Sequence, residues 1–270
     1  MTLGVAALVL ATGGAAGAAV TLTAPTTGGQ HLTISGTASS PAPAQRPLLA
    51  VVGASFSAGV GAGHPDQAWP EDLARIMHWR LALSADPGAG YVNPGAGHRG
   101  PFAKLAGRLH LARTDPGTII IQGGHDDIGR PLPLIRARVE RLIASVHRAC
   151  PRSRLAVLTV FPRGVPTPAT KATDQAIVAA ARQADPAIIV FDPITGHWQF
   201  PRIGDHLHPT PAGHEWIAHQ LARGLRADRV LDQVTSLSDR ASGSGRARGG
   251  PHRAAGVNPG SWLNTRPDLG

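Results

Sequence analysis

The sequence predicts an α/β fold, a three-layer α/β/α sandwich built on a five-stranded parallel sheet. Between residues 46 and 230, short apolar runs alternate with amphipathic stretches. A strand followed by a helix, repeated along the chain, is typical of parallel strands joined by right-handed crossovers. The apolar runs carry few polar residues, which is the composition of strands covered by helices on both faces.

Four of the apolar runs are strong strand candidates, and a fifth is weaker. The strong runs read LLAVVG (48–53), GTIIIQGG (117–124), RLAVLTVF (154–161) and AIIVFD (187–192). The weaker run covers residues 81–85, and we expect it at an edge of the sheet.

Amphipathic stretches separate these runs. The clearest is 132–149, where apolar residues recur at helical spacing and the arginines lie elsewhere. Its apolar face holds Leu134, Ile135, Val139, Leu142, Ile143 and Val146. Further helices are predicted at about 70–80, 101–112, 171–184 and 211–226.

Composition changes at both ends of the chain and predicts one domain with two appendages. Residues 1–24 open with an apolar stretch and small residues, as in a secretory signal peptide, although an uncleaved N-terminal anchor fits as well. Residues 25–45, rich in Thr, Ser, Pro and Gly, predict a flexible linker. The core domain is then 46–235, and 236–270 is predicted to be a disordered basic tail.

The chain has a formal net charge of +9, supplied almost entirely by arginine. Such a surface, and the tail in particular, could attract anionic cell-wall polymers. No arginine run is interleaved with aromatic residues, so nucleic-acid binding is not expected. Cys150 is the single cysteine, which excludes an intramolecular disulfide and a thiolate zinc site, and we expect it to be a packed bystander. No cofactor is predicted, and the protein is expected to be a monomer.

Polar residues follow the predicted strands directly. In parallel α/β sheets, ligands bind at the carboxyl ends of the strands. The residues at these positions are Ser55 in GASFS, Gly88 and Gly90 in DPGAGY, His125, Asp126 and Asp127 in GGHDD, and Asp205, His206, His208 and His214 in DHLHPTPAGH.

The DHLHP segment supplies what a serine nucleophile needs. Asp205 and His208 are three residues apart in one short loop, so the carboxylate can bond one imidazole nitrogen while the other faces Ser55. This arrangement would set the tautomer of the base and stabilise the imidazolium. The backbone N–H groups of Ser55 and Gly90 can approach a tetrahedral oxyanion.

These blocks, in this order, resemble those of the SGNH/GDSL hydrolases over residues 48–226. The resemblance implies a flavodoxin-like fold and a serine esterase or lipase that needs no metal. It places the nucleophile at Ser55, the base at His208 and the acid at Asp205. The family's oxyanion donors correspond to the backbone of Ser55 and Gly90 and to the side chain of Asp126.

Two residues depart from the family pattern. Ala54 stands where the first block usually has Asp, which affects loop support more than chemistry. Asp126 stands where the third block usually has Asn, and an ionised Asp cannot donate to an oxyanion. Asp126 is therefore protonated, or His125 replaces it as donor, or Asp126 faces away and two backbone donors suffice.

Other interpretations remain open from the sequence. The side chains of His125, Asp126, Asp127, Asp205, His206 and His208 are ligand types that suit a metal-dependent hydrolase, although no ligand follows the first strand. A catalytically impaired, glycan-binding member of the same fold is a third possibility. Simpler roles are expected for Ser57 (helix N-cap), Asp127 (loop anchor), Asp192 (turn former), and His206 and His214 (exposed or packed in loops).

The sequence thus predicts a secreted serine hydrolase of carboxylic esters, unless residues 1–24 anchor it in the cell envelope. The predicted substrate is a small-molecule or glycan ester with a short acyl group, such as an O-acetyl group. Aromatic residues make up only 4% of the chain, which argues against a long-chain lipase. Trp198, upstream of Asp205, is a candidate for the acyl or leaving-group side.

Overall fold

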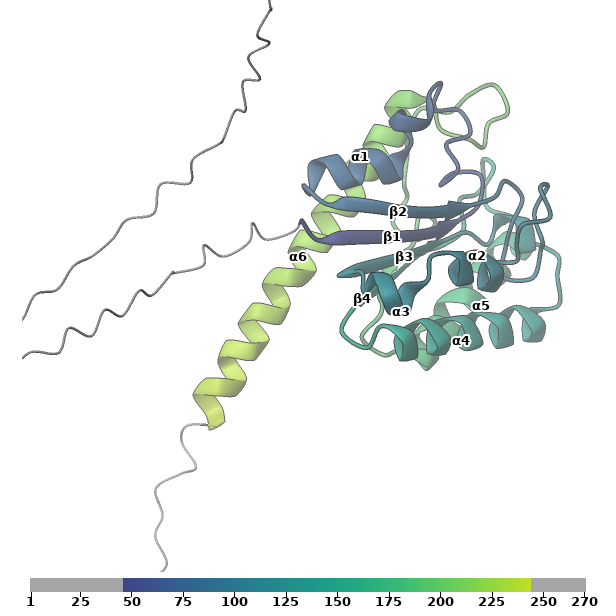
Figure 1. Ribbon diagram of the computed structural model, residues 1–270. Helices are drawn as coiled ribbons and strands as arrows, with labels where there is room; N and C mark the ends of the chain where they lie inside the picture. Colours follow the sequence, from purple (N-terminus) through teal and green to yellow (C-terminus); the bar gives the residue numbers. More distant parts are fainter. Residues whose placement is uncertain (1–45, 244–270) are drawn as a thin grey trace, which may run out of the picture. The chain divides into compact units, whose positions relative to one another are not determined.

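The computed structural model describes residues 46–243, which form a five-stranded parallel sheet with helices on both faces (Figure 1). The strand order is β2-β1-β3-β4-β5, so the weakest predicted strand is at an edge, as expected. The strands are β1 (Leu48–Gly53), β2 (Arg80–Ala85), β3 (Thr118–Gln122), β4 (Arg154–Leu158) and β5 (Ile189–Phe191).

The helices form the two outer layers of the sandwich. In Figure 1, α1 and α6 lie on one side of the sheet, and α2 to α5 lie on the other. The helices are α1 (Trp69–Ile76), α2 (Phe102–Arg108), α3 (Leu111–Thr114), α4 (Leu132–Ala149), α5 (Pro168–Ala184) and α6 (Pro211–Gly243), with short 3-10 turns at Pro65–Gln67 and His125–Asp127. The predicted three-layer α/β/α fold is confirmed.

The core is divided between the two faces of the sheet because side chains alternate along each strand. Ala50 and Val52 of β1 pack in the cluster that includes α2, α4 and α5. Leu49 and Val51 pack in the cluster that includes α1 and α6. Buried on both faces, β1, β3 and β4 hold their carboxyl ends in fixed positions at one rim of the sheet.

Two helices differ from the predicted ranges. The stretch 101–112 breaks into α2 and α3 because His110 adopts a left-handed conformation with φ of 48°. The last helix does not end near 226 but continues to Gly243, through the first residues of the predicted tail. No Gly or Pro occurs between Leu225 and Ser242, so nothing in that stretch breaks the helix.

The predicted signal or anchor (1–24), the predicted linker (25–45) and the rest of the predicted tail (244–270) lie outside the described residues. Within residues 46–243, no helix combines the length and the apolar character needed to cross a membrane.

Candidate active site

Ser55 lies in a tight loop at the end of β1, and hydrogen bonds to Gln122 hold this loop in place. The Gln122 side-chain oxygen, at the end of β3, accepts hydrogen bonds from the backbone N–H groups of Ala54 (3.3 Å) and Ser57 (3.2 Å) and from Ser57 Oγ (2.7 Å). Gly53 permits this turn, since a Cβ there would lie 2.1 Å from Ser57 Oγ. Ser57 is thus buried and links the ends of β1 and β3 through its hydrogen bonds to Gln122. The prediction that Ser57 caps a helix is wrong.

His208 connects Ser55 with Asp205. His208 Nε2 lies 2.8 Å from Ser55 Oγ, and His208 Nδ1 lies 2.5 Å from Asp205 Oδ2. A carboxylate only accepts, so His208 carries its proton on Nδ1 and presents the lone pair of Nε2 to the serine hydroxyl. The structure brings the three residues together in the geometry that a serine nucleophile, its base and an orienting acid require.

Asp205 is fixed by its own loop. Its Oδ1 accepts the backbone N–H groups of Leu207 and His208, both at 2.9 Å. Burial would raise the pKa of Asp205, but the hydrogen bond from His208 and the two backbone donors outweigh it and hold the pKa well below its ordinary value. Asp205 therefore stays ionised over the whole range in which an esterase works.

Aromatic side chains support the base. Phe56, which is buried, stacks on Phe161 with ring centroids 4.2 Å apart, and its centroid lies 5.4 Å from that of His208. Phe200 meets both phenylalanines edge-on. These rings limit the positions open to the His208 imidazole, which keeps Nε2 directed at Ser55.

The loop that follows β2 is held by Asp127. The Asp127 carboxylate accepts the backbone N–H groups of Tyr91 (2.7 Å), Val92 (3.0 Å) and Asn93 (3.1 Å). The prediction that Asp127 anchors a loop is confirmed. A Cβ on Gly90 would lie 2.4 Å from that carboxylate, so only glycine permits the approach.

The backbone N–H of Gly90 is engaged within its own loop, where it donates to the Asn93 carbonyl at 3.0 Å. The Ser55 N–H, by contrast, has no acceptor among residues 46–243. Of the two predicted backbone oxyanion donors, therefore, Ser55 is free and Gly90 is occupied.

Asp126 and His125 flank the same rim. Burial, reinforced by the charge of Asp127 and opposed by His125, raises the pKa of Asp126, which favours its protonated form. His125 Nδ1 lies 3.0 Å from the Phe161 carbonyl, so it donates there. Burial lowers the pKa of His125, and a neutral ring with its proton on Nδ1 has no N–H left for an oxyanion. The structure thus disfavours His125 as the substitute donor.

The metal-site interpretation finds no support in the positions of these side chains. Among the described residues, no three His, Cys, Asp or Glu side chains converge as ligands. His214 is fully buried, with Nδ1 accepting the Trp69 N–H (3.2 Å) and Nε2 donating to the Val60 carbonyl (3.1 Å). His214 therefore packs a loop, as expected, and Cys150 is buried with its thiol directed at the Leu111 carbonyl.

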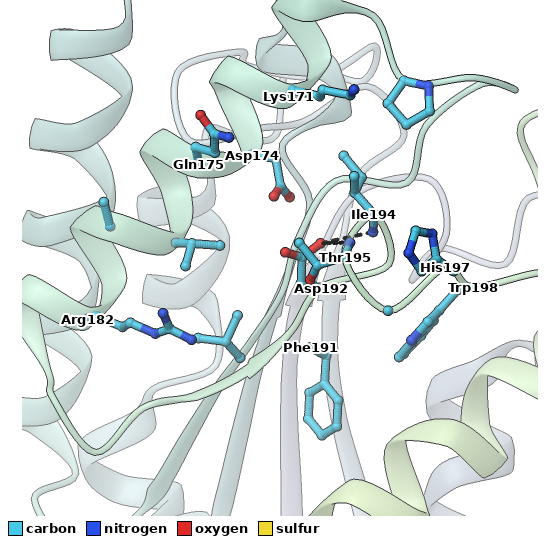
Figure 2. A pocket seen from close by; sticks show the side chains of 15 residues that line it. Lys171, Asp174, Gln175, Arg182, Phe191, Asp192, Ile194, Thr195, His197 and Trp198 are labelled. Atoms are coloured by element: carbon cyan, nitrogen blue, oxygen red, sulfur yellow. Dashed lines mark hydrogen bonds between the residues drawn. The ribbon is translucent and has the colours of Figure 1, made fainter.

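Two adjoining cavities lie beside this rim and share Pro166, Ile194, His197 and Trp198. The smaller, about 640 Å³, is also lined by Phe200, Arg202 and His206 and so reaches the loop that carries the triad acid. The larger, about 1080 Å³, has polar walls that include Lys171, Gln175 and Arg182 (Figure 2).

Two carboxylates stand in the larger cavity. Figure 2 shows Asp192 with its bonds from the Ile194 and Thr195 N–H groups, which confirms that Asp192 forms a turn. Burial, together with the neighbouring charge of Asp192, raises the pKa of Asp174 to about 6. The cavity combines an indole, a guanidinium, an amide and carboxylates, which are groups that hydrogen-bond and stack with polar ligands.

Comparison with known proteins agrees with this geometry. The GDSL-like lipase/acylhydrolase family matches residues 51–216, which is more than half of the chain. The chain belongs to this family. It is 30% identical to a GDSL lipase of Mycobacterium tuberculosis over 189 residues, covering 64% of this chain and 79% of the relative. The protein is therefore an ester hydrolase of the GDSL type.

Two solved family-two carbohydrate esterases share the fold. One, from Cellvibrio japonicus, has a TM-score of 0.59 at 16% identity, covering 70% of this chain and 63% of its own. Another, from Clostridium thermocellum in complex with cellohexaose, has a TM-score of 0.55 at 15% identity, covering 69% and 66%. At such identities the likeness shows the fold alone.

Several supporting residues were missed by sequence reasoning. Gln122 ends a strand that is otherwise apolar after its first residue, and a polar side chain in that buried position is a signal that it bonds something at the rim. Phe56 and Phe161 gave no such signal, because an aromatic residue near a strand end looks like any other core residue.

Proposed function

We propose that this GDSL-family hydrolase is a secreted esterase that cleaves short-acyl esters, such as O-acetyl groups on glycans, through a Ser55–His208–Asp205 triad. The observation that carries the proposal is the hydrogen-bonded chain from Ser55 Oγ through His208 to Asp205. A serine hydroxyl becomes an effective nucleophile only with such a base and orienting acid.

In the acylation step Ser55 Oγ attacks the ester carbonyl carbon while His208 Nε2 takes the hydroxyl proton. Asp205 stabilises the resulting imidazolium through Nδ1. The tetrahedral intermediate collapses, the bond to the leaving alkoxide breaks, and His208 returns the proton to it. Water, activated by the same imidazole, then cleaves the acyl-enzyme, which releases the acid and restores the Ser55 hydroxyl.

For the oxyanion we propose three donors: the N–H of Ser55, the N–H of Gly90 and protonated Asp126. The Ser55 N–H is free to act. The Gly90 N–H acts when the oxyanion displaces the Asn93 carbonyl as its acceptor. The raised pKa of Asp126 supports a neutral carboxyl there, which can donate as an amide would.

The substrate class rests on the two cavities beside the triad. Trp198, which is partly exposed, and its polar neighbours provide a stacking face and hydrogen-bonding groups for a sugar leaving group. The complex of the Clostridium thermocellum esterase with cellohexaose is in keeping with this assignment. Export is supported by the apolar stretch and the small residues of segment 1–24, and the basic tail suits anionic wall polymers.

A second candidate is a glycan-binding protein with impaired catalysis. It is favoured by the Asp at the family's Asn position and by the occupied N–H of Gly90.

One experiment separates the two candidates: hydrolysis of p-nitrophenyl acetate by the wild-type protein and by Ser55→Ala, with and without a chelator. We expect chelator-resistant turnover that falls about 10⁶-fold in kcat in the variant, the size of loss found when a triad serine is removed. Turnover that survives the substitution would refute the triad. No turnover above the spontaneous rate in either protein would favour the impaired, glycan-binding candidate.

A further inference from the structure

A separate cavity of about 650 Å³ lies between α2–α3 and α4, and we call it the α2–α4 cavity. Its buried floor is apolar and includes Ala106, Leu111, Leu142 and Val146. Its size lies within the range of roughly 300–1,000 Å³ that is typical of small-molecule sites.

The edge of the α2–α4 cavity is strongly basic. Arg113 comes from α3, and Arg138 and Arg141 come from α4. No Asp or Glu lines the cavity, and none of these three guanidinium groups forms an ion pair with a described residue. Unneutralised arginines beside an apolar floor favour an anionic amphiphile over a sugar or a cation.

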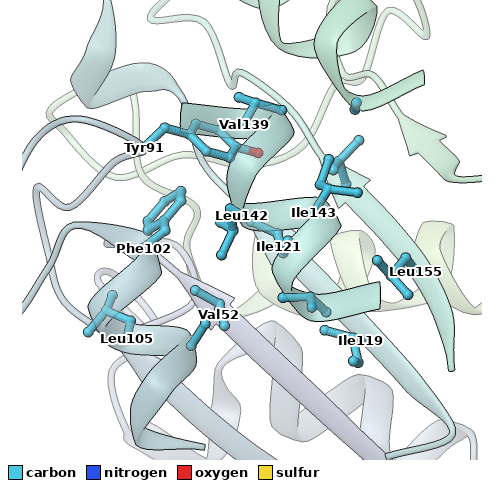
Figure 3. Packing of buried hydrophobic residues seen from close by; sticks show 14 of the residues in the cluster. Val52, Tyr91, Phe102, Leu105, Ile119, Ile121, Val139, Leu142, Ile143 and Leu155 are labelled. Carbon is cyan, nitrogen blue, oxygen red and sulfur yellow. The ribbon is translucent and has the colours of Figure 1, made fainter. Parts of the chain in front are cut away.

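Tyr91 forms part of the wall of the cavity. Its ring lines the cavity and packs edge-on against Phe102, with centroids 5.0 Å apart. Figure 3 shows the ring lying close to Val139 and Leu142 of α4. Its hydroxyl has almost no accessible surface, so a ligand in the cavity meets the ring of Tyr91 rather than its oxygen.

One face of α4 forms a long wall of the cavity, and we call it the groove face. Arg138, Arg141, Ser145 and Ala149 are spaced three or four residues apart, so they share one face of the helix. From Arg138 to Ala149 the helix rises about 16 Å. The two arginines lie toward one end of this face, and the small residues Ser145 and Ala149 follow toward the other.

We propose that the α2–α4 cavity binds a single-chain fatty carboxylate. The carboxylate is held by Arg138 and Arg141. The alkyl chain lies over Ala106, Leu111 and Val146. The site does not depend on the ester-hydrolase chemistry, although Tyr91 belongs to the loop that Asp127 anchors at the active site.

The test is calorimetric titration of the full chain with dodecanoate below its micelle concentration. Because an esterase could also bind the carboxylate as a product, the titration is repeated after Ser55 has been blocked with a phosphonate. We expect saturable one-site binding that the block does not change. Binding that is lost on blocking Ser55, or no saturable binding in either form, would overturn the proposal.

Matched variants test the location. Ser145→Trp, an exposed position on the groove face, should abolish binding by filling the cavity, whereas Ala144→Trp, also exposed but outside the lining, should leave it unchanged. Thermal melts of both variants show whether either substitution disturbs the fold. Binding by Ser145→Trp as tight as by the wild type would refute the assignment.

Further variants test the chemistry. Arg138→Ala with Arg141→Ala should weaken binding at least about tenfold, in line with charge-assisted hydrogen bonds. The control pair Arg136→Ala with Arg148→Ala removes the same charge from α4 outside the cavity and should have no effect. Dodecanol should bind at least about tenfold more weakly than dodecanoate. Equal affinity for the alcohol, or equal losses in both arginine pairs, would contradict recognition of a carboxylate at this cavity.

Discussion

The two sides of the active site are built differently. On the base side, residues 205–208 form one short loop whose internal hydrogen bonds fix the acid, and the acid in turn fixes the base. On the oxyanion side, the proposed donors come from loops after three different strands, and these loops are held by long-range hydrogen bonds such as that from the Tyr91 N–H to Asp127. A short local loop specifies its geometry within a few residues, whereas the oxyanion side depends on the whole sheet.

This difference has a consequence for catalysis. The base side is complete in the structure, with every hydrogen bond that the triad requires. The oxyanion side has one free N–H, one N–H bonded to Asn93 and one carboxyl whose protonation varies with pH. We therefore expect substitutions on the base side to cost the most and substitutions on the oxyanion side to change how activity depends on pH.

The largest effect in this comparison is expected for Asp205→Asn. The amide oxygen can still accept the Leu207 and His208 N–H groups, but the amide nitrogen then faces His208 Nδ1 and donates to it. The imidazole is forced to carry its proton on Nε2, facing Ser55, where it cannot act as a base. We expect kcat to fall about 10⁴-fold with little change in Tm.

Steady-state kinetics and a thermal melt check this prediction together. Asp185→Asn is the matched control: its carboxylate also accepts a backbone N–H, that of Ala187 at 3.0 Å, but it lies between α5 and β5, outside both cavities beside the triad, and should retain full activity. A loss smaller than about tenfold in Asp205→Asn would mean that the base is oriented by its aromatic neighbours rather than by the acid.

The second effect is on pH dependence and concerns Asp126→Asn. The pKa of Asp126 is raised, so the wild-type carboxyl is protonated and able to donate below that pKa, and ionised and repulsive above it. The amide donates at every pH. The ratio of variant to wild-type kcat should therefore be near one at low pH and rise with pH, toward about 100-fold, the value of one oxyanion donor.

A pH profile of both proteins on p-nitrophenyl acetate measures this ratio. The two proteins differ only at residue 126, so the ratio reports the effect of that side chain. A ratio that stays near one at all pH values would show that Asp126 faces away and that backbone donors suffice.

Local features of this protein could be predicted from the sequence, whereas features that depend on long-range packing could not. Apolar runs predicted the sheet, and the DHLHP spacing was enough to expect Asp205 and His208 in one loop. The occupied N–H of Gly90 could not be predicted, because it depends on how residues 90–93 turn back on themselves. The break at His110 and the long α6 were missed for a related reason: helix boundaries depend on packing and on single backbone angles as much as on periodicity.

The smallest effect is expected for Ser57→Ala, two residues from the nucleophile. The Ser57 hydroxyl donates to Gln122, but Gln122 also accepts the Ala54 and Ser57 N–H groups, so the loop keeps two of its three ties. Removing one buried hydrogen bond should lower the free energy of unfolding by about 1 kcal/mol and change kcat by less than about fivefold. Denaturant unfolding and steady-state kinetics measure the two quantities. A kcat loss approaching that of Ser55→Ala would mean that Ser57, not Ser55, is the nucleophile. A loss of stability without a loss of kcat would show that the loop holds Ser55 through its backbone hydrogen bonds.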